Sequence, residues 1–337
     1  MAVAMLAVAT TVNARSWRIH HDVAMKPDFT DINAAMASDN VQSGDTLYLD
    51  PGCALTSYQT INKCVTVIGT GYFRTDAPHS FAIINDVLEI DCNKVKVEGV
   101  IVNYEILIEA DNVSIERCKC KLVNISRYWY IRKHTTIRQC FIETGISGGR
   151  NGAQDGSCSQ FAQIENCIFR GGNAYIDDLG SPTITNNIFY TTNNRYTLNQ
   201  INGGIIQNNI FINQADATKV FSNITNTTIT NNVIVSSEEN YPTYASNNIF
   251  VDEDDGIITK EGSYTEDKYY QLTENSPAKG YGILNGVPVD CGPFGGPNPY
   301  VLNGLPKNTP YYTKAVVDSR SKNGKINVSL NIKMQDE

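Results

Sequence analysis

ITNNIFY, beginning at Ile184, recurs as IQNNIFI from Ile206, ITNNVIV from Ile229 and ASNNIFV from Ala245, so residues 184–250 contain one phrase four times. Three degraded copies precede these four: IERCKCK from Ile115, IRQCFIE from Ile137 and IENCIFR from Ile164. Successive copies begin 16 to 27 residues apart, a period typical of single coils of a solenoid rather than of helical pairs. The chain is therefore a repeat protein.

Aligning the copies produces columns of like residues. We expect the fourth and sixth columns to face inward; the fourth consists of Cys118, Cys140, Cys167, Asn187, Asn209, Asn232 and Asn248, and the sixth of Cys120, Ile142, Phe169, Phe189, Phe211, Ile234 and Phe250. The third column is polar, which fits a bend or an outward position, and asparagine tolerates the left-handed backbone of a bend. Its members are Arg117, Gln139, Asn166, Asn186, Asn208, Asn231 and Asn247. The fifth column, apolar except for Lys119, does not by itself indicate a face.

Each copy is thus predicted to be a strand, a bend and a second strand. Stacked coils place like residues above like, so that asparagine amides hydrogen-bond along the stack and Ile and Phe form apolar ladders inside it. In these features the sequence resembles the right-handed parallel β-helix, the fold of pectate lyases and polygalacturonases, in which asparagine ladders at the bends are a family feature. The resemblance implies an all-β, single-stranded solenoid.

The rest of the chain is expected to cap and wrap this solenoid. An amphipathic helix with Ile32, Ala35 and Met36 on one face predicts an N-terminal cap at 15–45, ahead of a β-helix at 46–256. Residues 257–337 are predicted to form an irregular wrap, rich in Gly and Pro, and then a β-hairpin around Asn323 and Gly324. The phrases SPAKGYG and DCGPFGG in the wrap resemble the closing segment of exported β-helix proteins of Bacteroides-type bacteria.

Charge and hydropathy narrow the range of partners. The 337 residues carry a formal net charge of −8, which disfavours a nucleic-acid partner because phosphate backbones require a basic surface. No apolar run reaches the length of a membrane span. We expect a monomer whose partner is a polysaccharide.

The first fourteen residues, MAVAMLAVATTVNA, predict a signal peptide with cleavage before Arg15. The alternative is a buried N-terminal strand. Cleavage would place the protein in the periplasm, on the cell surface or outside the cell. Nine cysteines occur, three of them in the inward fourth column, where they are expected to be core thiols; Cys53 and Cys64 are candidates for a disulfide.

The densest group of functional side chains is RYWYIRKH, at 127–134, just before the Ile137 copy. Aromatic rings offer flat faces to sugars and arginine pairs with uronate carboxylates, so Arg127, Tyr128, Trp129 and Tyr130 are candidate substrate-binding residues. In a lyase, Arg132, Lys133 or His134 would take the proton next to the carboxylate or stabilise the developing charge. The alternative is that the aromatic residues pack into the β-helix while Arg and Lys are merely solvated.

A second group combines Asp177 and Asp178 with Arg150 and Asp155, which lie in a glycine-rich insertion at 145–159. Paired carboxylates resemble the catalytic acid and base of polygalacturonases and the acidic clusters that hold calcium in pectate lyases. The remaining family signatures are missing, and a solvated turn is the alternative. No metal ligands are assigned, although calcium is possible.

Two functional hypotheses follow from these groups. The first is an exported, pectate-lyase-like protein that acts on or binds polysaccharide, as a lyase or hydrolase of acidic glycans. The second is a non-catalytic surface, glycan-binding or structural β-helix protein, because this fold hosts many functions. The first hypothesis requires the two groups of candidate residues to meet in one groove, whereas the second does not.

Export can be tested directly. Protein recovered from its native host should begin at Arg15, because the small residues at positions 12 and 14 suit signal peptidase. N-terminal sequencing measures this, and recovery of Met1 would contradict the prediction.

Overall fold

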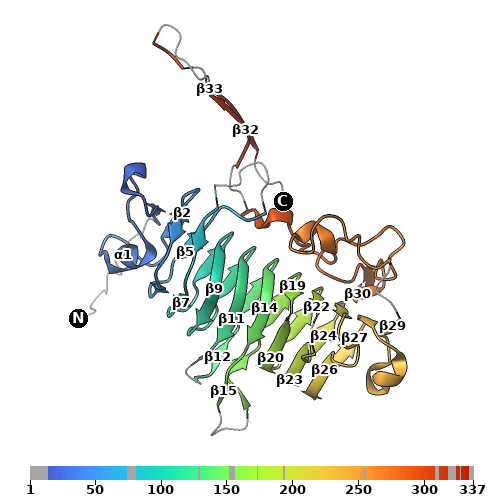
Figure 1. Cartoon of the computed structure of the whole chain (residues 1–337). Coiled ribbons are helices and arrows are strands. Elements are labelled where there is room, and N and C mark those ends of the chain that lie inside the picture. Colours follow the sequence, from blue (N-terminus) through green and yellow to red (C-terminus); the bar gives the residue numbers. More distant parts are fainter. Residues whose placement is uncertain are drawn as a thin grey trace, which may run out of the picture.

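The computed structural model describes residues 14–73, 81–127, 130–151, 156–172, 174–192, 194–252, 256–307, 311–317, 324–326 and 328–333. The chain is an all-β, right-handed parallel β-helix, as predicted from the repeats (Figure 1). Its coils stack side by side from the N-terminal cap to β29 (Ile249–Val251), and the C-terminal segment runs along one side of the stack (Figure 1). Of the expected signal peptide at 1–14, all but Ala14 lies outside the described residues.

The first face of the β-helix is a sheet of ten parallel strands. Ile115 pairs with Ile137 and Ile137 with Ile164, and this register continues through the later copies, so the first column of the alignment is a row of stacked residues. The strands are β1 (Ser16–Ile19), β2 (Thr46–Leu49), β5 (Thr66–Ile68), β8 (Lys96–Glu98), β10 (Ser114–Glu116), β13 (Thr136–Arg138), β18 (Gln163–Glu165), β21 (Thr183–Thr185), β24 (Ile205–Gln207) and β27 (Thr228–Thr230).

The second face follows the bend in each coil. Its strands are β3 (Ala54–Leu55), β6 (Ile83–Ile84), β9 (Ile101–Ile108), β11 (Lys119–Ile125), β14 (Phe141–Ser147), β19 (Ile168–Gly171), β22 (Ile188–Thr191), β25 (Ile210–Asn213), β28 (Val233–Val235) and β29. The third face contains β4 (Gln59–Ile61), β7 (Leu88–Ile90), the second halves of β9, β11 and β14, and then β20 (Tyr175–Gly180), β23 (Leu198–Asn202) and β26 (Phe221–Thr225). The short strands β12 (Arg132–Lys133) and β17 (Ser159–Gln160) extend this face beside β20.

The bend between the first and second faces has the predicted left-handed backbone. All seven third-column residues have φ between 52° and 57°. Asparagine adopts this conformation at lower cost than most residues, which explains why it fills the column in the later copies.

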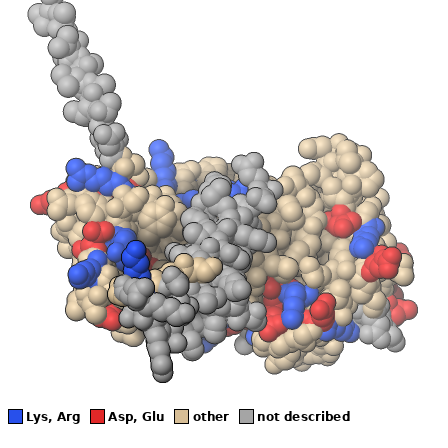
Figure 2. Space-filling model, turned by 90° about the horizontal axis from the view of Figure 1, so that it is seen from above, with Lys and Arg blue, Asp and Glu red and all other residues tan. Residues whose placement is uncertain are grey.

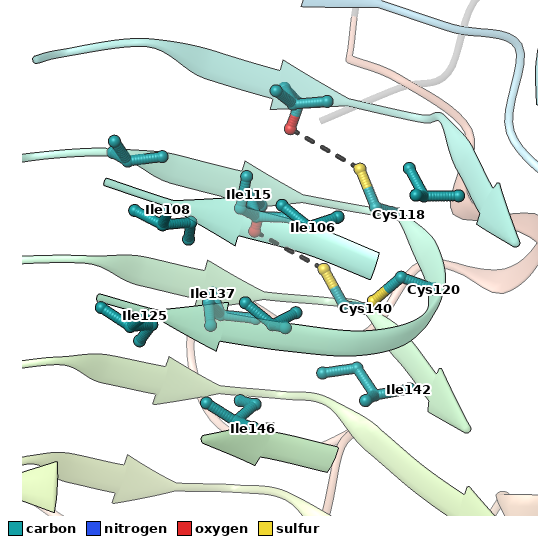
Figure 3. Packing of buried hydrophobic residues seen from close by; sticks show 14 of the residues in the cluster. Ile106, Ile108, Ile115, Cys118, Cys120, Ile125, Ile137, Cys140, Ile142 and Ile146 are labelled. Carbon is teal, nitrogen blue, oxygen red and sulfur yellow. Dashed lines mark hydrogen bonds between the residues drawn. The ribbon is translucent and has the colours of Figure 1, made fainter. Parts of the chain in front are cut away.

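The fourth column points inward, as predicted, and joins each coil to the one before it. The thiols of Cys118 and Cys140 lie one above the other and donate to the carbonyl oxygens of Val97 and Ile115, at 3.7 and 3.5 Å (Figure 3). In the later coils an asparagine amide makes the same bond: Asn209 Nδ2 donates to the carbonyl of Ile184 at 2.9 Å. The same side chain also accepts a hydrogen bond, which Asn187 Nδ2 donates to Asn209 Oδ1 at 3.0 Å. The asparagine ladder is confirmed.

The sixth column supplies much of the core. The rings of Phe169, Phe189 and Phe211 stack in parallel, with centroids 4.5 and 5.0 Å apart, and are fully buried. Phe250, in the last coil, is only half-buried. The sixth column is therefore inward, as predicted, up to the end of the stack.

The N-terminal cap contains the predicted helix, α1 (Ile32–Ala37), with η1 (Val23–Met25) ahead of it. The Asp31 carboxylate accepts from the Ala34 amide and begins the helix, which buries Ile32, Ala35 and Met36. The segment 15–45, predicted as the cap, also contributes β1, which precedes the helix and pairs with β2 at the start of the ten-stranded sheet. The first strand had no counterpart in the repeat, which begins much later in the chain.

The C-terminal segment 256–307 covers the second face. It contains η4 (Asp267–Tyr270), β30 (Gly282–Leu284), β31 (Val287–Val289) and η5 (Leu302–Gly304), and it follows the terminal turns η2 (Glu238–Asn240) and η3 (Pro242–Tyr244). Fifth-column residues such as Phe141 and Ile188 point outward and are buried in a second apolar cluster with Tyr270 and Tyr300 of this segment. The sequence did not show whether the fifth column points into or out of the β-helix. In the structure it points outward, under the C-terminal segment.

The third column attaches this segment to the β-helix. Asn166 Nδ2 donates to the carbonyls of Pro293 and Gly295 at 2.9 and 2.7 Å, and Gln139 Nε2 donates to that of Pro299 at 2.6 Å. Arg117, Asn186 and Asn208 make equivalent bonds. These side chains point outward but are buried under the wrap, where their amides satisfy an irregular backbone.

The predicted hairpin is present as β32 (Tyr311–Val317) paired antiparallel with β33 (Val328–Lys333), and it stands away from the β-helix (Figure 1). All nine cysteines are free thiols, so the disulfide considered between Cys53 and Cys64 is absent. Burial raises the pKa of the Cys118, Cys120 and Cys140 thiols well above the usual value, so these side chains keep their protons and remain donors.

Replacing Asn209 with Leu should lower the free energy of unfolding by about 2 kcal/mol or more. The variant leaves the Ile184 carbonyl and the Asn187 amide without partners, and each buried unpaired group costs about 1–3 kcal/mol. The exposed Asn202, replaced with Leu, is the matched control and should change stability by no more than about 0.5 kcal/mol. Equal denaturation midpoints for the two variants would contradict the ladder.

Candidate functional site

The third face carries a polar row that crosses four neighbouring coils. Asn124 of β11 pairs with Ser147 of β14, Ser147 pairs with Asp177, and Asp177 pairs with Asn199. Their immediate neighbours, including Ile146 and Ile176, are buried in the core, so alternation along each strand directs this row outward. Asp177, one of the predicted site residues, lies in the row.

Three arginines form ion pairs with carboxylates of neighbouring coils on this face. Arg127 pairs with Glu105 and Arg195 with Asp177, and the Nη2 atom of Arg132 lies 3.2 Å from Glu109 Oε2. The three carboxylates are buried, whereas 23 to 46% of each arginine side chain is exposed. Since a buried carboxylate requires a cation or several donors, these pairs hold the acidic groups at the surface of the stack and neutralise most of the local charge.

Two of the buried carboxylates keep an oxygen atom without a hydrogen-bond partner. These atoms are Glu105 Oε1 and Asp177 Oδ1. Buried polar atoms are nearly always hydrogen-bonded, so each of these is an acceptor left for an ordered water molecule. Both lie beside an arginine that still has donors facing solvent.

Tyrosine rings flank the ion pairs. Tyr130 is 65% exposed, with the Arg132 guanidinium 5.5 Å from its ring centre. Tyr175 is half-buried, and the Arg195 guanidinium lies 3.5 Å from its ring centre. Burial raises the pKa of Tyr175, although Arg195 opposes the effect, so this hydroxyl stays protonated and can donate a hydrogen bond.

The Tyr175 ring lies over Gly145 of the preceding coil. A Cβ at Gly145 would be 3.0 Å from Tyr175 Cδ1 and would collide with the backbone of Tyr175. Glu105 also contributes to the raised pKa of Tyr175, which shows that the two side chains are within electrostatic range across Gly145. The row, the ion pairs and the tyrosine therefore belong to one surface.

The described residues Arg127, Tyr130 and Arg132 lie on this surface rather than inside the coil. The Ser126 hydroxyl donates to the carbonyl of Tyr130, which turns the chain back toward β12. The alternative interpretation, in which Tyr130 packs into the β-helix, is wrong because the bend places its ring in solvent. Tyr128 and Trp129 lie outside the described residues.

Other predicted catalytic residues lie elsewhere. Lys133 and His134 are exposed at the corner that leads back to the first face, where the His134 ring stacks on Phe161 at 5.4 Å. Asp178 is half-buried and has a left-handed backbone, with φ of 59°. Lys133 and His134 are therefore positioned at a corner beside β17, not in the row that contains Asp177.

The glycine-rich insertion leaves the stack next to Arg127. Its strands β15 (Arg150–Asn151) and β16 (Gly156–Ser157) form a short antiparallel hairpin, and the Cys158 amide donates to the Gly149 carbonyl at its base. Gly149 packs against the carbonyl oxygen of Ser126 in the preceding coil. The insertion is thus close to the segment 127–134, as expected; the side chain of Arg150 and all of Asp155 lie outside the described part of the chain.

Sequence reasoning missed Glu105, Glu109, Tyr175 and Arg195. A signal for them exists, because acidic residues within the strongly apolar run 101–108 and just after it are rarely buried without a partner. Each carboxylate lies 18 to 23 residues from its arginine, which is close to one coil. A search for opposite charges one coil apart would have found all three pairs.

No protein-family model, curated protein or solved structure matches this chain. Within the described residues, no three His, Cys, Asp or Glu side chains gather in a way that could hold a metal ion. None of the described helices is both long and apolar enough to cross a membrane. Where the upper side of the molecule is visible in Figure 2, basic and acidic side chains are intermixed and neither sign forms a continuous patch.

The geometry of the third face suits hydrogen bonding better than proton transfer. Hydrolysis by two carboxylates requires one free acid and one free base or nucleophile, whereas Glu105, Glu109 and Asp177 are each bound to an arginine. The carboxylates paired with Arg127, Arg132 and Arg195 offset most of the positive charge that these arginines could offer to an enolate-like intermediate. What remains accessible is a series of donors, acceptors and tyrosine rings.

Proposed function

We propose that this protein binds polysaccharide along its third face without cleaving it. The observation that carries the proposal is the pair of buried, unpartnered carboxylate oxygens, Glu105 Oε1 and Asp177 Oδ1, on a surface flanked by Tyr130 and Tyr175. Sugar hydroxyls both donate and accept, so they can bind these oxygens through a bridging water molecule and accept directly from the exposed parts of the neighbouring arginines. The apolar C–H faces of sugar rings pack on tyrosine.

The solenoid supports a ligand that is itself a repeating chain. Neighbouring coils are spaced by about 4.8 Å, so groups on successive coils recur along the axis of the stack. The polar row and the ion pairs follow this axis. An extended polymer could therefore contact several coils at once, and many weak contacts would add to a useful affinity.

An acidic-glycan lyase or hydrolase is the second candidate. The buried carboxylates favour it, because burial is one way in which enzymes tune a carboxyl group for acid catalysis. The arginine bound to each carboxylate disfavours it, as does the position of Lys133 and His134 at a separate corner. Export to the periplasm, cell surface or medium, a pectate-lyase-like relationship and a monomeric state belong to the same proposal, and they rest on the sequence alone.

Replacing Tyr130 or Tyr175 with Ala should weaken polysaccharide binding about 2-fold to 12-fold, because an aromatic packing contact is worth about 0.5–1.5 kcal/mol. Affinity electrophoresis or calorimetry with a panel of neutral and acidic polysaccharides measures this effect. Tyr48, an exposed residue of the N-terminal coil, is the matched control when replaced with Ala. If the three variants bind equally, the third face is not the binding surface.

The same panel distinguishes binding from catalysis. Long incubation should release neither reducing ends nor unsaturated uronates, which absorb in the ultraviolet. Product formed by the parent protein and lost in the Asp177→Asn variant would instead establish the catalytic alternative.

A further inference from the structure

A cavity of about 160 Å³ lies at the corner between the second and third faces. Arg170 and Tyr190 occupy the seventh column of consecutive copies on β19 and β22, and Tyr264 comes from the C-terminal segment that runs along these strands (Figure 1). The lining residues are Arg170, Gly171, Gly172, Tyr190, Thr192 and Tyr264.

Arg170 differs from the arginines of the third face because, among the described residues, no carboxylate lies within ion-pair distance of it. Arg127, Arg132 and Arg195 each have an acidic partner, whereas Arg170 forms no ion pair with any described residue. Its Nε atom is buried and has no hydrogen-bond partner. A half-buried cation without a counter-charge is unfavourable, so an anion entering the cavity would gain a charged hydrogen bond and relieve that cost.

Aromatic rings hold the guanidinium in place. The central carbon of the guanidinium lies 4.4 Å from the centre of the Tyr264 ring. Arg170 also interacts with Tyr270: burial raises the pKa of this tyrosine, and the Arg170 cation opposes part of that effect. Tyr264 is 54% exposed, so a ligand can reach the ring and the cation from solvent. The arginine is therefore oriented before any ligand binds.

Glycine keeps one wall of the cavity open. Gly171 has φ of 147°, and a Cβ there would collide with the carbonyl oxygen of Glu143 in the preceding coil. A Cβ at Gly172 would meet only the Thr192 hydroxyl, at 4.0 Å. The cavity thus combines one cation, two phenol rings, a hydroxyl and bare backbone, a set that suits a small, ring-shaped, hydroxylated anion.

We propose that this cavity binds the carboxylate of a single acidic sugar unit. The proposal rests on the polysaccharide-binding function given above and extends it, because it assigns selection for acidic sugars to Arg170 instead of to the paired arginines. Gly172 precedes Tyr175 by three residues, a span of at most roughly 10 Å. A chain bound on the third face could therefore place one of its units in the cavity.

The test is a titration of the full-length protein with glucuronate or galacturonate, followed by calorimetry or by NMR shifts. The parent should bind the uronate, and Arg170→Gln should bind it at least tenfold more weakly, while Arg170→Lys retains part of the affinity. Methyl glucoside, which lacks the charge, and acetate, which lacks the ring, should both bind at least tenfold more weakly than the uronate.

The matched control is Arg18→Gln, because Arg18 is an arginine paired with Asp50 in the first coils, and uronate affinity should not change in it. Equal uronate binding by the parent and Arg170→Gln would overturn the inference, as would equal binding of uronate and acetate. Melting temperatures show whether each variant is folded, and Tyr264→Ala provides a second variant that removes a wall without touching the strand.

The two proposals can fail separately. If polysaccharide binds to the third face and uronate does not titrate, the cavity assignment is wrong while the proposed function stands. If uronate binds through Arg170 but no polysaccharide binds, or the tyrosine variants of the third face behave as their control does, the proposed function is wrong and the cavity assignment stands.

Discussion

The structure depends on a hydrogen bond that the fourth residue of each repeat donates to the first residue of the coil before it. The left-handed bend at the third residue turns the fourth side chain into the stack, where it reaches the first-column carbonyl of the coil before it. Cysteine supplies a thiol in the earlier coils and asparagine an amide in the later ones, as Cys140 to Ile115 and Asn232 to Ile206 illustrate. The two residue types look unrelated in the sequence, but each places a donor at the same point inside the stack.

The same bend decides which face remains open to solvent. Its left-handed residues turn polar side chains outward along one edge, and these side chains bind the backbone of the C-terminal segment, as Asn166 and Asn186 do. The segment then covers the second face and its fifth-column apolar residues. The polar row lies on the third face, where Ser147 and Asn199 are half-buried and Asp177 is buried, so part of this face can be reached by a ligand.

The repeats predicted the strands, the bends and the inward columns because periodic burial leaves a periodic pattern. They could not predict the covering of Phe141 and Ile188, because the segment that covers them has no period and its path depends on backbone contacts. The candidate site was found only in part for a similar reason. RYWYIRKH stood out by composition, but its partners Glu105 and Glu109 lie 22 and 23 residues earlier in the sequence and emerge only when charges are compared from one coil to the next.

Within the described residues Arg170 has no carboxylate partner, and the one polar member of the fifth column, Lys119, explains why. Glu143 precedes Arg170 in the seventh column and would be its natural partner one coil away. Instead, the Nζ atom of Lys119 lies 2.8 Å from Glu143 Oε1, on the outer side of the second face. Because Lys119 pairs with Glu143, this carboxylate is not available to Arg170. The Arg170 guanidinium can therefore pair with an anionic ligand. On the third face, ion pairs between coils neutralise most of the charge. At the corner with the second face, Glu143 pairs with Lys119 instead of Arg170, and this leaves a site for an anion at Arg170.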